Sequence, residues 1–324
     1  MNNNSIYLNI HHELEDSFTN FFESKCYQRL TPVPISSHVD RSVYLVNSAT
    51  NLFKPYFASS HCVFAIQHCM RTQILSDYYN KEQESQYPTT FDSYGAFVPA
   101  SLLCKVLIDS VEYFASIGFD FTKMRVRASC DDITLLSAIS QSLPFMSVEL
   151  DKRTEKYDHK YGDGVTGRAV KLDYYQEWQE KHKNLCYFIL IYRENTPIGV
   201  ELATSDQLII MRLQNKKYGI SVSKIADVLP ISSFEERRFA DSVVGTAHLL
   251  YEGLQPNSST TNGRTLKKYI AALQHFNKLL GHSEKRIAPT ILRYIEIEYG
   301  ELPESKKQYV SELLDKWIAV YSAK

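Results

Sequence analysis

The spacing of apolar residues predicts helices near both ends of the chain and strands through its middle. Between residues 14 and 22, apolar side chains recur three or four positions apart, which is typical of one face of an amphipathic helix. The run 102–114 has a broad apolar face of the same period, and Gly118 is a plausible stop for it. DDITLLSAI (131–139) begins another helix, with an aspartate as its cap.

Shorter apolar runs predict strands, because β-branched and aromatic residues dominate them or alternate with polar ones. The polar, tyrosine-rich stretch 72–90 between two of these runs indicates a long loop, and the glycines of GDGVTG (162–167) indicate a turn. We therefore expect strands at 42–46, 61–70, 91–98, 123–129, 185–192 and 207–213.

The pattern becomes helical again from about residue 235. Apolar residues between 266 and 280 recur at helical spacing, and the polar insert 255–264 separates two helices. The tail from Glu236 carries 13 Lys/Arg and 10 Asp/Glu, a net charge of +3, so the part before it is slightly acidic. We expect two units, a mixed α+β domain over 1–235 and a helical domain over 236–324.

Composition narrows the class of protein. The chain has 324 residues, 44% of them apolar, and its 36 basic and 37 acidic residues give a net charge near zero. Six cysteines without a CxxC pair argue against a disulfide framework or a zinc ribbon. The polar, acidic start is unlike a signal peptide, and no uncharged apolar stretch reaches 18 residues. We therefore expect a cytoplasmic protein with reduced thiols and no membrane partner.

Few residues indicate a catalytic or ligand-binding role on their own. The histidines and cysteines of HCVFAIQHC (61–69) are close in sequence, but neighbouring residues of a strand face opposite ways, so we expect no metal site. Arg71, at the exit of a predicted strand, is placed to bind a phosphate or carboxylate bidentately, or is simply solvated. Basic residues near the start of one tail helix can follow a nucleic-acid backbone or form a solvated face: Arg264, Lys267 and Lys268.

Read in order, the segments of residues 14–285 resemble the catalytic core of alanyl-tRNA synthetase, a class II aminoacyl-tRNA synthetase. VNSA (46–49) and FK (53–54) resemble the family's Phe-Thr-Asn-Ala-Gly strand and the Phe-Lys after it, and AIQHCMRT (65–72) resembles its Thr-Ser-Gln-Lys-Cys-Val-Arg-Ala strand. FDSYGAF (91–97) resembles Phe-Glu-Met-Leu-Gly-Asn-Phe, and RRFADSVVGTAHLLYEGLQPN begins the helical region that binds the tRNA acceptor stem in that family.

The resemblance implies a fold and a set of site residues. The fold would be a class II synthetase-like antiparallel sheet flanked by helices, followed by a helical tRNA-recognition-like domain. Arg71 would bind the α-phosphate of ATP, carried with Mg²⁺, and Asp92 would contribute to the ATP and substrate sites. A small amino acid or another carboxylate would be bound by Gln67, Asp92, Asn184 and Glu201, with the acceptor stem at Arg264, Lys267 and Lys268.

The sequence departs from the family most strongly at its third motif. An ungapped reading puts Glu201 at the aspartate that holds the substrate ammonium and Leu208 at the arginine that contacts the γ-phosphate. Lys183 replaces the tryptophan before Asn184. The loss of a bidentate phosphate ligand weakens transition-state stabilisation. We therefore expect a paralogue of the core, without the family's editing and C-terminal domains.

Two functions remain open on the sequence. The first is a ligase that forms an acyl- or aminoacyl-adenylate from ATP and passes the acyl group to a tRNA or another carrier. The second is an impaired paralogue that binds tRNA in a regulatory role or uses aminoacyl-tRNA in a transfer without ATP. The third motif favours the second function, whereas the residues retained around Arg71 favour the first. The sequence does not fix the oligomeric state.

Overall fold

A nine-stranded, mainly antiparallel sheet forms the centre of the computed structural model, which describes residues 5–162 and 164–322. The strand order is β1-β2-β3-β9-β8-β7-β4-β5, with β6 paired to β7; only β1–β2 and β4–β5 are parallel. The strands are β1 (Gln28–Arg29), β2 (Val63–Met70), β3 (Thr90–Val98), β4 (Met124–Ser129), β5 (Ser147–Asp151), β6 (Asp158–Gly162), β7 (Val165–Gln176), β8 (Lys181–Arg193) and β9 (Thr196–Ser205). This architecture confirms the predicted α+β class with an antiparallel sheet.

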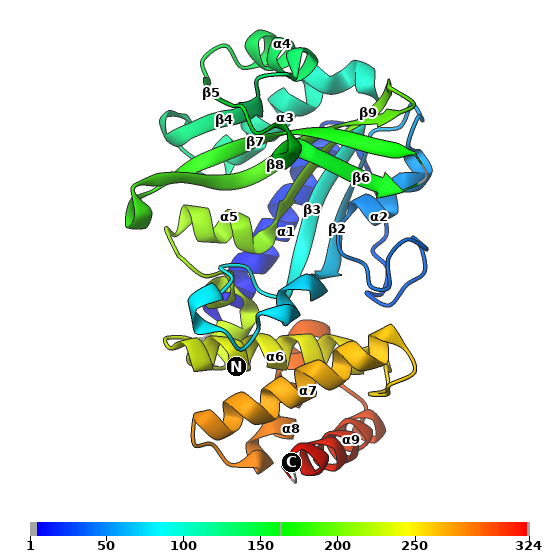
Figure 1. Ribbon diagram of the computed structural model, residues 1–324, viewed down its shortest axis with the longest axis vertical. Coiled ribbons are helices and arrows are strands. Elements are labelled where there is room, and N and C mark those ends of the chain that lie inside the picture. The colour runs from blue at the N-terminus through cyan, green and yellow to red at the C-terminus, as the bar shows by residue number, and fades with distance from the viewer. Residues whose placement is uncertain (1–4, 163, 323–324) are drawn as a thin grey trace.

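Helices flank the sheet and continue beyond one end of it. Apolar residues of α1 and α3, including Phe18 and Val106, share one buried core with the sheet, while α6 to α9 form a separate layer (Figure 1). The α-helices are α1 (Ile6–Ser24), α2 (Thr50–Phe53), α3 (Leu103–Ser116), α4 (Ile133–Ser142), α5 (Asp206–Leu213), α6 (Phe234–Tyr251), α7 (Thr261–Leu279), α8 (Ile287–Tyr299) and α9 (Glu304–Ser322). The helical continuation predicted after the sheet is therefore present.

The strand register divides the sheet into two chemically different faces. One row of paired residues crosses six strands, from β2 to β4, and its members share a face because side chains alternate along each strand. The row is Ala65, Gly95, Ala203, Tyr187, Lys171 and Arg127. We call this the Arg71 face, because Gln67, Cys69 and Arg71 continue the same alternation along β2. The opposite face carries residues such as Phe64 and Tyr94 and packs on α1 and α3.

Two predicted strands were wrong, and one predicted helix cap was confirmed in position but not in its hydrogen bond. Residues 42–46 form bends rather than a strand, and the predicted strand at 207–213 is instead helix α5. The side chain of Ser205 explains the second difference, because it accepts a hydrogen bond from the amide of Leu208 and so caps a helix. Asp132 stands at the cap position of α4, but its carboxylate pairs with Arg168 and makes no capping bond.

The helical layer begins close to the predicted boundary. Helix α6 starts at Phe234, where Ser233 and Glu236 form a capping box. The apolar core of the helical layer also includes side chains from the first part of the chain: Ile35, Leu45, Met70 and Tyr78. The division at residue 235 stays a prediction, because the two parts share buried surface. Within the described residues, no helix combines the length and apolar character needed to cross a lipid bilayer.

Candidate functional site

A cavity of about 490 Å³ lies on the Arg71 face of the sheet. Its walls are the segment 40–54 and the end of the β6 strand, and its floor includes Tyr187 and Ile189 of β8 and Ala203 of β9. Asn47, Ser48 and Thr50 add polar groups. A cavity of this volume, with an apolar floor and a few polar groups, is suited to a small organic ligand.

Glu201 lies directly beneath this cavity. It is 0% exposed, and its carboxylate accepts hydrogen bonds from the hydroxyls of Thr50 and Tyr161. Burial raises the pKa of Glu201 to about 7, although both hydroxyls oppose that shift. The carboxyl group therefore changes charge near neutral pH, and a cationic group in the cavity would favour its ionised form.

Arg71 follows β2 and lies at the same face, where it forms no salt bridge within the described residues. Its guanidinium carbon is 4.1 Å from the centre of the Phe91 ring and 5.6 Å from that of Tyr87, and its Nη1 donates to the carbonyl of Pro88 at 3.1 Å. Burial lowers the pKa of Arg71, yet the group stays charged at neutral pH. No carboxylate of residues 5–162 or 164–322 forms a salt bridge with it, so the guanidinium can take an anionic ligand.

Two more cations occupy this region, and sequence reasoning missed both. The Nζ atom of Lys171 is 5.3 Å from the centre of the Tyr187 ring, and burial lowers the pKa of this lysine. The side chain of Arg212 on α5 is almost completely buried, and its Nε donates to the carbonyl of Asn184 at 3.0 Å. Arg212 was missed because residues 207–213 were predicted as a strand, and in helix α5 its side chain points in a different direction.

Of the predicted substrate residues, Gln67 is fully occupied within the protein. Its Oε1 accepts from the amide of Val33 at 2.8 Å, and its Nε2 donates to the carbonyl of Val33 at 2.7 Å. The side chain thus attaches the 31–35 segment to the sheet. Asn184 of β8 is paired with Asp173, and its buried Oδ1 has no hydrogen-bond partner among the described residues. The Arg71 face therefore holds Arg71, Gln67, Asn184 and Glu201.

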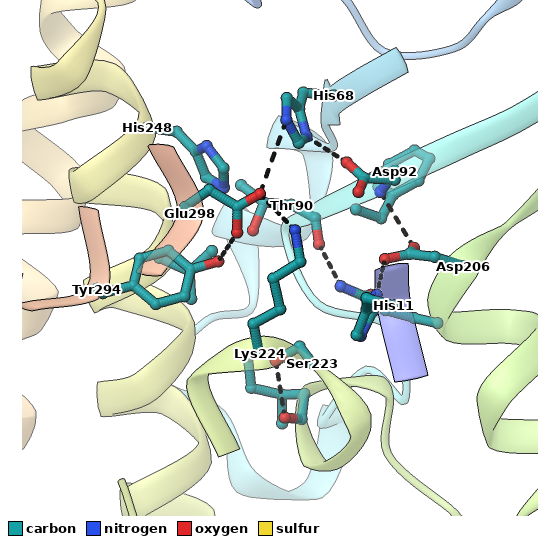
Figure 2. Close-up of a pocket in the computed structure, with 14 residues that line it drawn as sticks. His11, His68, Thr90, Asp92, Asp206, Ser223, Lys224, His248, Tyr294 and Glu298 are labelled. Carbon is teal, nitrogen blue, oxygen red and sulfur yellow. Dashed lines mark hydrogen bonds and ion pairs between the residues drawn. The ribbon is translucent and has the colours of Figure 1, made fainter. Parts of the chain in front are cut away.

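Asp92 lies on the opposite face, away from Arg71. Because Phe91 faces Arg71, its neighbour Asp92 in β3 points the other way and contacts Nδ1 of His68. The structure thus separates Asp92 from the other residues predicted for the ATP and substrate sites. It places Asp92 in a polar cluster between the sheet and the helical layer, which we call the junction cluster: His11, His68, Asp92, Asp206, Lys224, His248, Tyr294 and Glu298 (Figure 2).

Opposite charges are matched within the junction cluster. The Nζ atom of Lys224 is 2.7 Å from Glu298, and Nε2 of His68 is 3.7 Å from the same carboxylate (Figure 2). Burial disfavours the imidazolium, but the carboxylates of Asp92 and Glu298 outweigh this effect and raise the pKa of His68 to about 9. His11 is 3.0 Å from Asp206 in the same way. Each of the three carboxylates therefore faces a lysine or a histidine.

The junction cluster also has the spacing of a metal site. One ligand atom from each of His68, Asp92 and Glu298 lies within 4.8 Å of the others. A divalent cation there would have to displace the proton of His68 and lie beside the ammonium of Lys224. The space available is only about 20 Å³. Since protons and Lys224 already neutralise the carboxylates, we assign no metal to this cluster.

The predicted tRNA-binding residues lie along the first turns of α7. Arg264 and Lys268 are exposed, whereas Lys267 is partly buried and donates to the hydroxyl of Ser258 at 2.7 Å. Positions 264, 267 and 268 share one side of the helix. Thr261 and Thr265 of this helix line a second cavity, of about 220 Å³, which shares Ser42, Val43 and Asn47 with the cavity over the sheet. The start of α7 therefore adjoins the Arg71 face.

Comparison with known proteins gives weak likenesses only. No family model matches the chain. An apo histidyl-tRNA synthetase from S. aureus is similar at 14% identity and a TM-score of 0.44, over 62% of this chain and 65% of that one. A pyrrolysyl-tRNA synthetase from Desulfitobacterium hafniense has 10% identity and a TM-score of 0.41, over 65% and 71%.

A third solved structure is described as the RNA-binding domain of threonyl-tRNA synthetase from Cryptosporidium parvum. It has 11% identity and a TM-score of 0.42, over 82% of this chain and 79% of that one. All three TM-scores lie below 0.5, so any function for this chain has to be supported by its own residues.

Proposed function

We propose that this chain is a synthetase-like ligase that binds ATP on the Arg71 face and forms an acyl- or aminoacyl-adenylate there. The acyl group would then pass to a tRNA end or another carrier. The observation that carries the proposal is Arg71, a partly buried guanidinium that forms no salt bridge with a carboxylate of the described residues. It lies close enough to Tyr187, which lines the cavity, to lower the pKa of that tyrosine against the larger, raising effect of its burial.

The chemistry assigns one role to each charged group. Arg71 binds the α-phosphate and stabilises negative charge while a substrate carboxylate oxygen attacks the phosphorus. The bond from the α-phosphorus to the leaving pyrophosphate breaks, giving acyl-AMP and pyrophosphate. Glu201, beneath the cavity, attracts a substrate ammonium. In the second step a carrier hydroxyl attacks the acyl carbon, and AMP leaves with the electron pair of the broken bond.

The Mg²⁺ that accompanies ATP finds no dedicated site in these residues. Asp173 is committed to Arg127 at 3.0 Å, and Glu201 is enclosed by two hydroxyls. Mg²⁺ bound to the phosphate oxygens would offset charge on the leaving pyrophosphate. The chain's contribution is therefore cationic side chains rather than metal-binding carboxylates.

ATP–pyrophosphate exchange, screened across the amino acids with alanine included, tests adenylate formation. We expect exchange with at least one small amino acid, and a loss of about 10- to 100-fold in Arg71→Ala, since a charge-assisted hydrogen bond is worth about 1.5–3 kcal/mol. Lys316→Ala, an exposed change on α9, is the control and should leave exchange intact. Normal exchange in Arg71→Ala would contradict the proposal.

The second candidate is a tRNA-binding protein or a transferase that needs no ATP. The exposed cations of α7 and the cavity beside Thr261 favour it, because both would allow an acceptor stem to bind with its end toward the Arg71 face. Replacing Arg264, Lys267 and Lys268 with alanine should weaken tRNA binding and reduce the salt dependence by up to three phosphate contacts. Lys316→Ala, at an exposed site on α9, is the control.

These assays separate the two candidates. If no amino acid supports exchange and tRNA binding depends on α7, the second candidate is favoured. A salt dependence that is the same in the triple variant and in Lys316→Ala would remove α7 as the contact surface.

A further inference from the structure

Strand β5 is the last strand of the sheet and leaves one backbone edge open. Among the described residues, β4 is the only strand that pairs with it. The carbonyl of Asp151 accepts from the amide of Cys130, so the backbone groups of Asp151 point toward β4. Successive residues of a strand direct their backbone groups to opposite sides. The amides and carbonyls of Val148 and Leu150 therefore point to the open edge, where another strand can pair with them.

The side chains along this edge are apolar and incompletely covered. Val148 is 42% exposed and Leu150 is 57% exposed, although their neighbours on β4 are buried in the core that the sheet shares with α4. Phe145, just before β5, is 62% exposed, and its ring centre is 5.7 Å from that of Phe121. An exposed apolar strip of this kind is typical of a surface that binds another protein chain.

The helix beside this edge is uncharged. Residues 133–148, which contain α4 and the connection to β5, include no Asp, Glu, Lys or Arg, and Ile133 at the start of α4 is 77% exposed. Figure 1 shows α4 and β5 together at the end of the molecule opposite the helical layer. Strand β5 also contains neither lysine nor proline, the residues that commonly block pairing at an edge. Because an uncharged surface does not repel an identical surface, this one is compatible with a second copy of the chain.

We propose that the β5 edge is an interface between two copies of this chain, in which the two β5 strands pair antiparallel about a two-fold axis and join the two sheets. One register is favoured. With Val148 opposite Leu150 of the second copy, the pairing uses the open backbone groups of both residues in both chains, more than any other two-fold register does. The same register packs the two apolar side chains against each other across the interface.

The charges near this edge fit the proposed register. Glu149 would face Glu149 of the second copy on the other side of the sheet, and in each copy Arg125 of β4 already forms a salt bridge with this glutamate. The two carboxylates therefore meet with their charges offset. The interface is also independent of the proposed function, because β2, which leads to Arg71, lies near the other end of the strand order.

Sedimentation velocity of the full chain at concentrations of about 1–100 µM tests the interface. We expect a dimer, and we expect Leu150→Lys to weaken it by about 100-fold or more, because lysine blocks edge pairing and the two-fold axis applies the change twice. Leu279→Lys is the matched control: Leu279 lies on α7, is 59% exposed and should leave the dimer intact when replaced. Circular dichroism should show the wild-type fold in both variants.

A cysteine at position 149 tests the register. In the proposed pairing, Glu149→Cys places two thiols directly opposite each other, so mild oxidation should join the two chains through a disulfide. Ser147→Cys has no such counterpart in this register. It should give no more crosslinked dimer on a non-reducing gel than wild type, in which Cys26 and Cys130 are exposed.

Three results would overturn the inference. A wild type that is monomeric at every concentration would mean that a different protein chain covers β5. A dimer that persists in Leu150→Lys would place the interface elsewhere on the molecule. Crosslinking in Ser147→Cys as strong as in Glu149→Cys would contradict the two-fold pairing of the β5 strands.

Discussion

The junction cluster and the Arg71 face are both rich in charged side chains, but they differ in how many of these charges are paired. In the junction cluster, each of the three carboxylates faces a lysine or a histidine. On the Arg71 face, Arg127 pairs with Asp173, but three other cations form no salt bridge with a carboxylate of the described residues: Arg71, Arg212 and Lys171. Burying a charge is costly unless it is paired. We therefore infer that the paired charges of the junction cluster stabilise the fold, and that the unpaired cations are available to bind an anionic ligand.

The comparison also separates Asp92 from the other residues predicted for the ATP and substrate sites. Its carboxylate is used to fix His68, and its backbone amide donates to Asp206 at 3.1 Å. The first contact links β3 to β2 within the sheet, and the second links β3 to α5. Asp92 therefore stabilises the junction between the sheet and α5, and its role in the ATP and substrate sites stays a prediction.

The largest effect should come from breaking a pair in the junction cluster. We expect Lys224→Met to lower the free energy of unfolding by about 3–5 kcal/mol, because Glu298 would lose its closest cation inside the protein. Urea denaturation measures this. Lys316→Met, on the exposed side of α9, is the control and should stay within about 0.5 kcal/mol of wild type. A loss below about 1 kcal/mol in Lys224→Met would show that the cluster is not scaffold.

A smaller effect should appear in the pH dependence of stability. The folded pKa of His68, about 9, is above the unfolded value of about 6.5, so its contribution is complete below pH 6.5 and is lost as the pH rises through 9. Because 36% of the side chain is exposed, we expect a loss of only about 1–2 kcal/mol over this range. His68→Asn should remove this part of the profile. Equal slopes in both proteins would contradict the assignment.

The smallest change in stability should follow removal of an unmatched cation. Arg212→Met removes a buried charge without a carboxylate partner and loses one hydrogen bond to Asn184, so we expect the free energy of unfolding to stay within about 1 kcal/mol of wild type or to rise. Thermal or urea unfolding checks this. If Arg212→Met lowers the free energy of unfolding as much as Lys224→Met does, Arg212 stabilises the fold. The proposed difference between the two regions would then be wrong.

Periodicity predicted four of the nine strands, β2, β3, β4 and β8, and the helical character of the tail, but it missed the long strands β7 and β9. It also failed where a side chain decided the local structure. The run 207–213 is apolar enough for a strand or a helix, and Ser205 as a helix cap selects the helix. At 42–46, the carboxylate of Asp40 accepts from the amide and hydroxyl of Ser42 and favours a bend over a strand.

The site was partly predictable for the same reason. Residues two apart in a strand share a face, so Gln67 and Arg71 could be grouped from the sequence, and the same alternation excludes Asp92 once Phe91 is placed beside Arg71. Asn184 and Glu201 reach that face only through pairing between strands distant in sequence. Lys171 and Arg212 gave no signal, because only the folded protein shows that neither forms a salt bridge with Asp173, which is bound to Arg127.

The core of the helical layer has a consequence for synthesis on the ribosome. Ile35 and Tyr78 contribute to that core, and the amide of Ile35 donates to the carboxylate of Glu252, 217 residues later. At about 5–20 residues per second, these early apolar side chains wait about 10–40 seconds for their partners to be translated. During this interval the nascent chain exposes surface that chaperones bind, and a ribosome stalled before α6 would release a chain that cannot bury it.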